Sequence, residues 1–365
     1  MVSAAILLSR QSLRPCGADP WVRATQQAVL WAASEGHRLH TSLGMTTWEL
    51  VLALASLNAV PVTLHLASST AADPLLANHL EHDFGLSQEK TRVITVDEST
   101  PAAASGSVML RRDQSVVEAA DVIIPISVRP GGHMAALIAQ AQARGKRVID
   151  TFVVPYPRQQ GALSYRVNED CLNPELTGFA PGEYVVHWTR AANRHWPDER
   201  PLDFYSALVA SYAYPRDALA TLRHILTTRR IIASGRHMPR AVKTVSFTAC
   251  EPIAMIPHMR WRARWREMSF EPYGIGIRTA RAQSIGIESV VYVERRTKNP
   301  AEQWKTQTMG IKTDWRTERE FRHRGNLDLT DLPLDDLIVF CRFPREADAL
   351  RKETGLRVVP MELTG

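Results

Sequence analysis

The sequence predicts an α/β domain built on a parallel sheet, followed by an α+β domain. Its 365 residues exceed what one core normally organises and fit two domains of roughly 150 to 200 residues each. Residues 1–155 alternate short apolar runs with helical periodicity, the pattern of a parallel sheet covered on both faces. Residues 183–365 carry many short strand signals and few helices. Residues 156–182, rich in Pro, Gly and polar residues, are the expected linker.

The composition excludes several classes of protein. Hydrophobic residues make up 45% of the chain and charged residues 22%, which is typical of a globular protein. No window approaches the ~18 uninterrupted apolar residues of a membrane helix, and "MVSAAILLSR" lacks the basic start of a signal peptide. The four cysteines are scattered without paired spacing, which argues against disulfides and against a zinc site. We therefore expect a cytoplasmic protein with no membrane contact and no metal.

Periodicity and stop signals define the elements of the first domain. The run "SAAILLS" is short and apolar, as a buried strand is. The next segment begins at Asp19, repeats apolar residues at helical spacing and ends at Gly36, so we expect a helix. By the same criteria we expect strands at 37–42, 60–67, 118–127 and 146–154, and helices at 46–58 and 133–145.

Two turns of this domain contain glycine directly before a helix. Gly44 lies in "TSLGM", and Gly131 and Gly132 lie in "SVRPGGHM". A glycine turn lets backbone N–H groups and a helix N-terminus face a phosphate. In parallel sheets ligands bind beyond the carboxyl ends of the strands, where both turns fall. The pattern indicates a nucleotide-type binding domain.

The first 155 residues resemble the superfamily that joins the DNA-processing protein Smf/DprA with the cytokinin-activating LOG enzymes. That family has a Rossmann-like nucleotide-binding domain with an early Ser-Arg, a Ser-Gly turn, an Arg-Asn or Arg-Asp pair and a Gly-rich turn before a helix. The resemblance implies that ligand-binding residues lie at the matching positions, which are Ser9, Arg10, Ser42, Gly44, Arg112, Asp113, Arg129, Gly131 and Gly132.

One departure from that family bears on activity. Hydrolytic LOG members carry Gly-Gly-x-Gly-Thr followed by a Glu, whereas this chain has "GGHMAALIAQ". The carboxylate that would act as acid and base in hydrolysis is therefore missing. We expect binding of a nucleotide or of nucleic acid here rather than hydrolysis. The alternative is a vestigial pocket in a domain that serves as a scaffold.

The second domain begins with the strand "GEYVVHWTR". Helices are expected at 203–214 and 215–230, the second opening on a proline. Further strands are expected at 241–252, Tyr273–Ile277, 288–296, 335–343 and 356–363, with a helix at 344–355. This mixture favours an α+β fold.

Polar residues gather at the strand ends of this second domain. The candidates are His187, Thr189, Ser246, Thr248, Tyr273, Glu318 and Glu320. A carboxylate stabilises an oxocarbenium-like sugar or deprotonates an acceptor. An imidazole and hydroxyls can hold ribose, and an aromatic ring can stack on a base. We expect these side chains to meet around one ribose-sized cleft.

The order of these motifs resembles ADP-ribosyltransferase-like domains and uncharacterised abortive-infection domains. The segments that carry it are "YVVHWTR", "VSFTACEP", "FEPYGIGI" and "WRTEREFR". The resemblance implies NAD as the cofactor, with His187 and Thr189 on its ribose side. It implies Ser246 or Tyr273 as the support on the nicotinamide side. Glu320 is the implied catalytic carboxylate, with Glu318 second.

Plainer interpretations stand beside these. A histidine at a strand end is commonly a satisfied structural residue, and Glu318 and Glu320 among arginines can form a surface ion-pair ladder. The segment "RWRARWRE" is expected to be a helix whose Trp261 and Trp265 pack together. Its four arginines could instead contact phosphates.

The charge distribution favours a polyanionic partner. Net charge is +6, and residues 223–324 hold 21 Lys or Arg against 9 Asp or Glu. We expect DNA as a partner and a nucleotide as the ligand of the first domain. The leading hypothesis is a two-domain bacterial enzyme acting on DNA or nucleotides, ADP-ribosyltransferase-like, in a phage-defence or mobile-element system. The alternatives are a DNA nucleobase-modifying enzyme without NAD and a non-catalytic DNA-binding or nucleotide-sensing protein.

Overall fold

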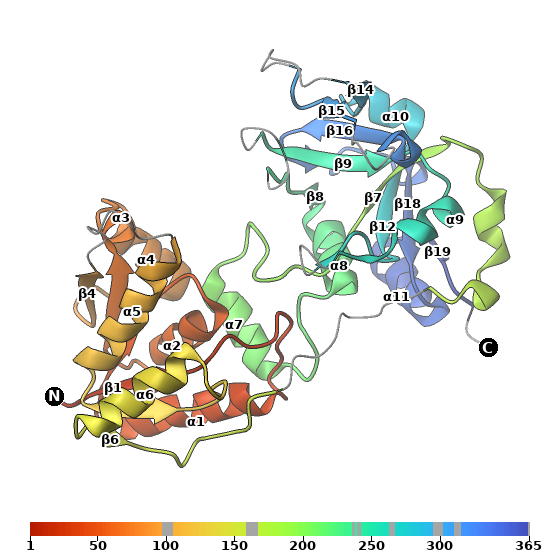
Figure 1. Cartoon of the computed structure of the whole chain (residues 1–365). Helices are drawn as coiled ribbons and strands as arrows, with labels where there is room; N and C mark the ends of the chain where they lie inside the picture. Colours follow the sequence, from red (N-terminus) through yellow and green to blue (C-terminus); the bar gives the residue numbers. More distant parts are fainter. Residues whose placement is uncertain are drawn as a thin grey trace. The chain divides into compact units, whose positions relative to one another are not determined.

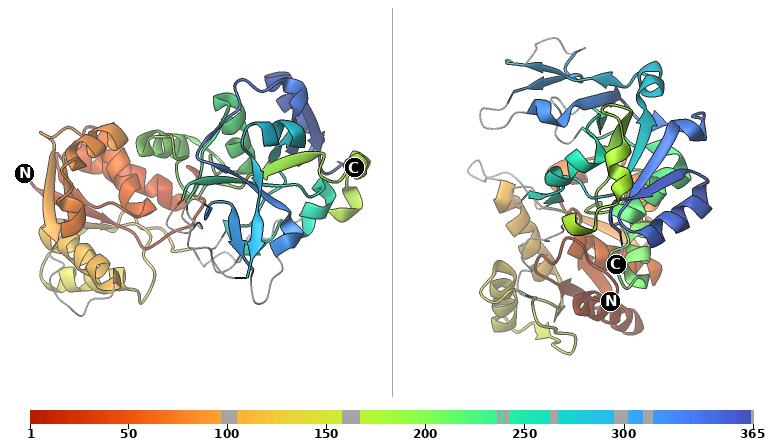
Figure 2. Two further views of the ribbon diagram at one scale, coloured as in Figure 1. Left: turned by 90° about the horizontal axis from the view of Figure 1, so that it is seen from above. Right: turned by 90° about the vertical axis from the view of Figure 1, so that its right-hand side faces the viewer.

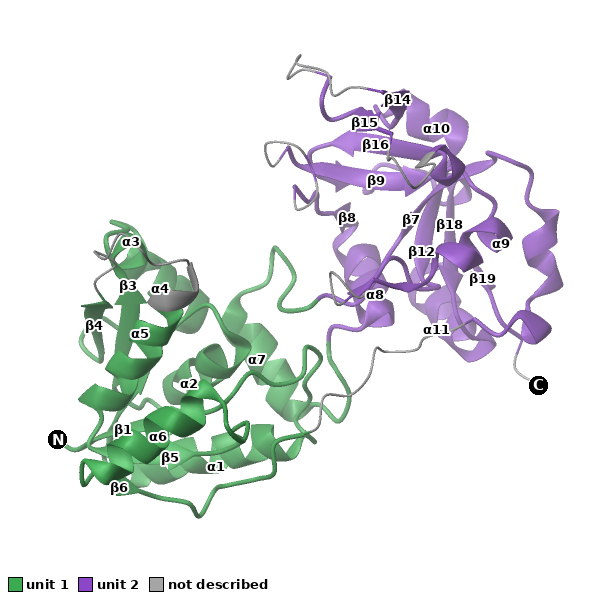
Figure 3. Ribbon diagram, in the orientation of Figure 1, with its two compact units in different colours: residues 1–160, 193–215 green, residues 161–192, 216–365 purple. Residues whose placement is uncertain are grey.

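The chain folds into two compact units, shown in Figure 3. The computed structural model describes residues 1–96, 105–157, 167–235, 238, 242–262, 267–294, 302–309 and 315–363. Unit 1 comprises Met1–Gln160 and Asn193–Pro215, and unit 2 comprises Gly161–Ala192 and Arg216–Gly365. Residues 193–215, which we expected in the second domain, therefore belong to unit 1. The chain passes between the units after residues 160, 192 and 215.

Unit 1 is built on one parallel six-stranded sheet in the order β4-β3-β2-β1-β5-β6 (Figure 1). Its first strand, "SAAIL", is buried along its whole length, because helices cover both faces of the sheet. The strand order confirms the expected Rossmann-like α/β domain. The strands are β1 (Ser3–Leu7), β2 (Arg38–Thr41), β3 (Val62–Ala67), β4 (Thr91–Val96), β5 (Val122–Pro125) and β6 (Arg147–Val148).

Seven helices of the described chain belong to unit 1 and lie on both faces of its sheet (Figure 2). α1, α2, α4 and α7 enclose the larger core on one face, and α5 and α6 enclose a second core on the other. The sequence analysis had not assigned β4 or the three helices α3 to α5. The helices are α1 (Pro20–Ser34), α2 (Thr46–Leu57), α3 (Ser68–Ala71), α4 (Leu76–Phe84), α5 (Ser105–Ala119), α6 (His133–Ala143) and α7 (Pro201–Ala210).

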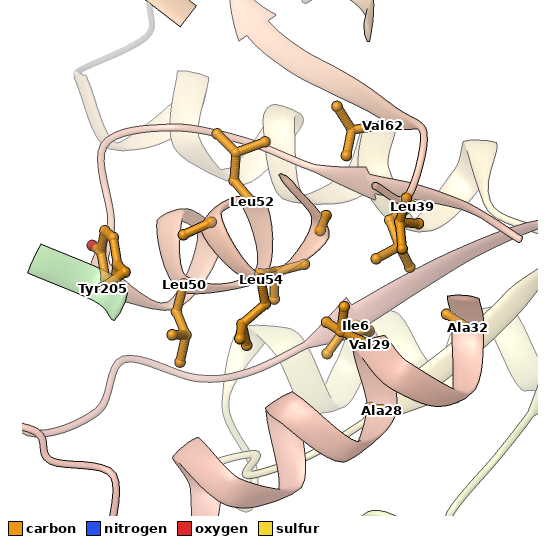
Figure 4. Close-up of a cluster of buried hydrophobic side chains, with 14 of the residues drawn as sticks. Ile6, Ala28, Val29, Ala32, Leu39, Leu50, Leu52, Leu54, Val62 and Tyr205 are labelled. Atoms are coloured by element: carbon orange, nitrogen blue, oxygen red, sulfur yellow. The ribbon is translucent and has the colours of Figure 1, made fainter. Parts of the chain in front are cut away.

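Helix α7 explains why residues 193–215 belong to unit 1. Its Phe204, Tyr205 and Leu208 are almost fully buried in the larger core of that unit. Figure 4 shows Tyr205 beside Leu50 of α2 in this core. Burying these side chains removes several hundred square ångströms of apolar surface from water, at about 25 cal/mol per Å². The helix is thus an integral part of unit 1.

Unit 2 contains a seven-stranded mixed sheet in the order β13-β16-β9-β7-β12-β18-β19. The β18–β19 pair is parallel and the other pairs of this sheet are antiparallel. This arrangement agrees with the expected α+β domain. The strands are β7 (Tyr184–Trp188), β9 (Thr244–Thr248), β12 (Gly274–Arg278), β13 (Glu288–Ser289), β16 (Glu320–Arg324), β18 (Leu337–Cys341) and β19 (Arg357–Pro360).

The two faces of this sheet carry different cores. On the first face, α8 (Ala218–Thr228), α10 (Thr279–Ser284) and α11 (Pro344–Thr354) pack against the sheet. On the second face, η2 (Pro174–Gly178) and α9 (Pro252–Met255) do so. Shorter elements complete the unit: β8 (Arg230–Ile231), β17 (Leu327–Asp328), β14 (Val291–Val293), β15 (Thr306–Thr308), η1 (Glu169–Cys171), η4 (Ile256–His258), η5 (Trp315–Glu318) and η6 (Leu334–Asp336).

The expected helix at residues 260–267 is wrong. β10 (Trp261–Arg262) and β11 (Glu267–Met268) pair antiparallel, with Trp261 opposite Met268. Residues 263–266, among them Trp265, lie outside the described part of the chain. The alternation of Arg with apolar residues has the period of two that a strand requires, and that period prevails here.

The described residues contain no membrane-spanning helix, no candidate metal cluster and no disulfide. No helix among them is long and apolar enough to cross a membrane. No group of three or more His, Cys, Asp or Glu side chains among them is placed to hold a metal ion. Cys16, Cys171, Cys250 and Cys341 are free thiols.

Candidate functional site

The strand order of the unit 1 sheet reverses between β1 and β5. The space outside the carboxyl ends of these two strands is called the crevice of unit 1. The chain runs from β1 through β2 and β3 to β4 on one side, whereas β5 pairs with β1 on the other side. The loops that follow β1 and β5 therefore leave the sheet in opposite directions at its carboxyl edge. Open α/β sheets bind ligands at this switch point.

Hydrogen bonds hold these two loops together. The Ser9 N–H donates to the Ser127 carbonyl at 3.0 Å, and the Arg129 N–H donates to the Ser9 hydroxyl at 2.9 Å. Gln11 is buried and its Nε2 donates to the carbonyls of Ser9 and Ser127 at 3.1 and 2.9 Å. The side chains of Arg10 and Arg129 are exposed on these loops. These hydrogen bonds thus connect the two loops, and each loop carries one exposed arginine.

The Gly-rich turn leads into α6 without a capping side chain. Gly131 has φ +67°, a left-handed conformation that glycine adopts without strain, and open space surrounds the place where a Cβ would stand. Gly132 is the N-cap of α6, and it has no side chain that could cap the first turn of the helix. The N–H groups of that turn and the positive end of the helix dipole remain available to an anion.

The loops beside this helix end carry more positive than negative charge. Residues 8–19 and 126–133 contain three arginines and one acidic residue, Asp19, whose carboxylate accepts from the Cys16 N–H. An anion there meets an excess of cations together with backbone N–H groups. The arrangement has the donor set of a phosphate or carboxylate site.

The turn after β2 is braced from two sides. Gly44 has φ +87°, and its N–H donates to Glu49 Oε1 at 2.9 Å. Arg112 donates to the Leu43 carbonyl at 3.2 Å, and Arg194 donates to the Gly44 carbonyl at 2.9 Å. The turn therefore has a fixed conformation one strand away from the crevice.

Two of the residues expected at this turn serve the fold. The Ser42 hydroxyl is buried and donates to the His65 carbonyl at 2.7 Å. Arg112 is also buried, and its guanidinium is paired with Asp113 at 2.8 Å. Both side chains position the turn. By contrast, Arg10 and Arg129 are exposed on the loops after β1 and β5, and Gly131 directly precedes the N-cap of α6.

The sequence analysis missed a buried carboxylate at this turn. Glu49 of α2 accepts from the Gly44 N–H and from the Tyr205 hydroxyl at 2.8 Å, and Arg194 lies 3.5 Å away. Burial and the neighbouring Glu49 raise the pKa of Tyr205 well above its usual value, so the phenol stays protonated and donates. No sequence signal pairs Glu49 with residues about 150 positions further along the chain.

In unit 2, the structure brings together only some of the polar residues that were expected to form one cluster. The Ser246 hydroxyl on β9 donates to Glu320 Oε1 on β16 at 2.9 Å. Arg322, which is buried, forms two hydrogen bonds of 2.8 Å with the Glu320 carboxylate. Arg322 also donates to the carbonyls of Trp304 and Thr306. Glu320 is thus the ion-pair partner of a buried guanidinium.

Glu318 lies next to this pair. Burial and repulsion from Glu320 raise the pKa of the Glu318 carboxyl group, while Arg262 and Arg260 oppose the shift. Among the described residues, none is seen to hydrogen-bond with that carboxyl group. The Thr248 hydroxyl donates to the Glu318 carbonyl and fixes the backbone. The Glu318 carboxyl group is thus protonated more readily than an ordinary glutamate.

His187 does not join this cluster. In β7 it lies opposite Ile275 of β12, and its ring packs against Phe247 at 5.7 Å, on the face where α8, α10 and α11 pack. Successive residues of a strand point to opposite faces, so Ser246 and Glu320, which flank Phe247 and Phe321, point to the other face. The expected convergence of His187 with Glu320 is therefore wrong.

The remaining candidates of unit 2 make contacts typical of structural residues. The Thr189 hydroxyl is buried and donates to the carbonyls of Ala218 and Tyr273. The Tyr273 hydroxyl donates to Glu346 at 3.1 Å, at the start of α11. Burial lowers the pKa of His187, and its Nδ1 lies 2.9 Å from the Ser246 carbonyl, to which an N–H there donates. These contacts connect the strands with the helices of that face.

Comparison with known proteins yields only remote likeness. No protein-family model matches the chain, and no curated protein sequence matches it. DNA processing protein A (DprA) from Streptococcus pneumoniae is similar over 44% of this chain and 53% of its own, with a TM-score of 0.32 and 11% identity. DprA from Helicobacter pylori, described with a single-stranded DNA binding mode, covers 44% of this chain and 67% of its own, with a TM-score of 0.29 and 15% identity.

These values are too low to assign a family or an activity to the chain. This chain spans about half the length of the Streptococcus pneumoniae protein that it matches. What the structure itself defines is a class: a two-unit protein whose unit 1 is a Rossmann-like domain with exposed arginines on the loops at its switch point.

Proposed function

We propose that the protein binds nucleic acid through phosphate groups held at the carboxyl edge of the sheet in unit 1. The observation that carries the proposal is the meeting of Arg10 and Arg129 with the uncapped N-terminus of α6 on two hydrogen-bonded loops. A phosphate there accepts from backbone N–H groups and from guanidinium groups together. Gly131 lets the backbone approach the ligand closely.

A polymer suits the protein better than a single nucleotide does. Net charge is +6 and the pI is about 9.3, so the chain attracts a ligand that carries many phosphates. Arg194, which is half-buried and pairs with Glu49 at 3.5 Å, adds a third arginine at the neighbouring turn of unit 1. Several phosphate contacts multiply affinity through counterion release, whereas a mononucleotide has only one such group. We propose DNA as the ligand, and a nucleotide in the same crevice is the alternative.

Replacement of Arg129 by alanine tests the proposal. We expect wild-type protein to bind a fluorescein-labelled single-stranded DNA in anisotropy titrations, and Arg129→Ala to weaken that binding about fivefold to tenfold at ~100 mM salt. Arg144→Ala is the matched control, because Arg144 is an exposed arginine at the opposite end of the same helix. Equal affinities for wild type and Arg129→Ala would refute the site. A competing mononucleotide that displaces the DNA would favour the alternative ligand.

A second candidate function concerns unit 2, where we infer NAD-dependent group transfer. The observation in its favour is that Ser246, Glu318 and Glu320 lie together, with Glu318 shifted toward its protonated form. Because Arg322 occupies the Glu320 carboxylate, Glu318 is the group that could serve as acid and base. His187, on the other face of the sheet, has no part in this version.

The test of this second candidate is release of nicotinamide from NAD. Wild-type protein should release it in the presence of DNA, and Glu318→Gln should lower the rate at least a hundredfold with unchanged thermal unfolding. His187→Gln serves as the control and should retain the rate. Absence of nicotinamide release from wild-type protein would reject the candidate and leave the binding proposal for unit 1 untouched.

A further inference from the structure

Strand β4 forms an open edge of the sheet in unit 1 (Figure 1). Only β3 pairs with it among the described strands. The Val62 N–H donates to the Lys90 carbonyl at 2.9 Å, so the backbone groups of Lys90, Arg92 and Ile94 point toward β3. The N–H and C=O groups of the alternate residues, Thr91, Val93 and Thr95, then point away from the sheet. The Thr91 N–H donates to the Gln88 carbonyl at 3.4 Å within the preceding turn, and the other groups of these residues form a row of donors and acceptors that can pair with another strand.

The side chains of this edge lack the usual protection against pairing. Natural edge strands carry charges, proline or bulges. The sequence "TRVITV" has β-branched residues at five of its six positions and a single charge, Arg92. The exposed fractions of Val93 and Ile94 are 41% and 37%, one on each face of the strand. Both faces of the edge are therefore apolar and open.

Apolar surface continues beyond the strand on both sides. Toward α4, a hollow of about 290 Å³ is lined by Leu76, Leu80, Leu86 and Val93, and Leu75 is exposed beside it. Toward α5, which packs on β3 and β4, Met109 and Leu110 are exposed. An added peptide strand would pair with β4 but would bring nothing to cover these flanks. A second sheet with its own flanking helices would cover them.

We propose that a second copy of this chain pairs with β4 antiparallel, so that two six-stranded sheets join across a two-fold axis. An axis perpendicular to the sheet pairs residues that share a face, so the centre of symmetry falls on one residue. With Val93 at the centre, Val93 meets Val93, Arg92 meets Ile94, and Thr91 meets Thr95. A centre on Arg92 would place two guanidinium groups opposite each other, which is unfavourable.

The register centred on Val93 also satisfies the backbone. Thr91, Val93 and Thr95 are the residues whose N–H and C=O groups point outward, and this register sets them opposite one another in hydrogen-bonded pairs. The threonine pairs and the valine pair are favourable cross-strand contacts, and the aliphatic stem of Arg92 covers Ile94. The strand is thus complementary to itself in charge, in shape and in hydrogen bonding.

The mass of the full-length protein in solution tests this proposal. We expect light scattering after gel filtration at tens of micromolar to give twice the chain mass of 40.9 kDa. Val93→Lys places two charges at the axis and should raise the dimer dissociation constant at least a hundredfold. Leu30→Lys is the matched control, since Leu30 of α1 is exposed to 47%, similar to Val93, and should leave the dimer intact. A monomeric wild type, or a Val93→Lys variant that stays dimeric, would overturn the proposal.

A cross-link gives a second test that does not depend on disrupting the dimer. Residues in a hydrogen-bonded antiparallel pair have Cα atoms about 5.5 Å apart, which a disulfide can span. Val93→Cys should therefore form a covalent dimer under mild oxidation, at a rate at least tenfold above that of the wild type with its four native cysteines. Leu30→Cys should remain at the wild-type rate. Equal rates for Val93→Cys and Leu30→Cys would contradict the register.

Discussion

Two histidines at the centre of unit 1 form a chain of hydrogen bonds that depends on charge. His40 Nδ1 lies 2.8 Å from His65 Nε2, and His65 Nδ1 lies 2.8 Å from the Ser115 hydroxyl. Neutral rings with a proton on each Nδ1 satisfy both contacts. A second proton on His65 would turn Nε2 into a donor that faces another donor. The chain therefore favours the neutral state of both rings.

Burial lowers the pKa of His40 and of His65 to about 4. Other charges act on the pair: Asp121 raises the pKa of His40, whereas Arg38 and Lys146 lower it. Unfolded histidine titrates near pH 6.5. The unfolded chain therefore binds protons between pH 6.5 and about 4 that the folded unit does not bind, so stability is complete above pH 6.5 and falls as the pH approaches 4.

We predict that unit 1 loses stability across this window. A shift of this size corresponds to roughly 3 kcal/mol for one histidine, and less than double for the coupled pair. Urea unfolding at pH 7 and pH 4.5, followed by circular dichroism, measures the loss. The double variant His40→Gln, His65→Gln should lose less stability between these two pH values than wild type, whereas the exposed His82→Gln should behave as wild type. A wild-type difference no larger than that of the double variant would disprove the account.

Also at the scale of single residues, burial and hydrogen bonding within the fold separate the expected site residues that are exposed from those that support the structure. Arg10 and Arg129 are exposed arginines on the loops after β1 and β5, and their positions follow from the strand ends alone. Ser42 and Arg112 belong to the same set of sequence motifs, yet their side chains are buried and donate hydrogen bonds to backbone carbonyls. Sequence shows which residue types are present, but a competing intramolecular acceptor becomes visible only in three dimensions.

At the scale of the elements, α7 packs into unit 1 through an apolar face and through the hydrogen bond of Tyr205. The Tyr205 hydroxyl donates to Glu49 within the buried interface, and Glu49 in turn holds the Gly44 N–H. Phe204 and Leu208 supply the apolar contacts. The helix thus supports the β2–α2 turn through Glu49.

We predict that Tyr205→Phe destabilises unit 1 by about 1–2 kcal/mol, because the buried Glu49 carboxylate loses one of its donors. Chemical unfolding monitored by fluorescence measures the change. Tyr212→Phe, at a side chain exposed to 86%, is the matched control and should change stability by less than about 0.5 kcal/mol. Identical unfolding of the two variants would contradict the role of this hydrogen bond.

The elements also show how far periodicity alone could predict the fold. The buried strands β1, β3 and β5 and the helices α1, α2 and α6 stand out because their apolar runs are long or regular. Strand β4 went unassigned because its side chains are exposed at an edge, so its sequence lacks the signal of burial. Residues 260–267 fit two periods at once, and the antiparallel pairing of Trp261 with Met268 and of Arg262 with Glu267 shows that the strand period prevails.

At the scale of the whole molecule, two features of the candidate sites were beyond sequence reasoning. The chain leaves unit 1, returns to it for residues 193–215 and leaves again, so Arg194 and Tyr205 join a turn formed by residues 42–49. In unit 2, a period of two along each strand decides the face, and it separates His187 from Ser246 and Glu320. Motif order along a sequence does not reveal on which face of the sheet each side chain lies.

The central claim is that phosphates of a nucleic acid bind where the loops after β1 and β5 meet. The most direct measurement is the salt dependence of single-stranded DNA binding by wild type and by the double variant Arg10→Ala, Arg129→Ala. Each phosphate contact contributes about 0.7 to the slope of log K against log salt for a single strand. We predict that the double variant lowers the slope by about 1.4 and the affinity more than tenfold. A slope and an affinity unchanged from wild type would contradict the account.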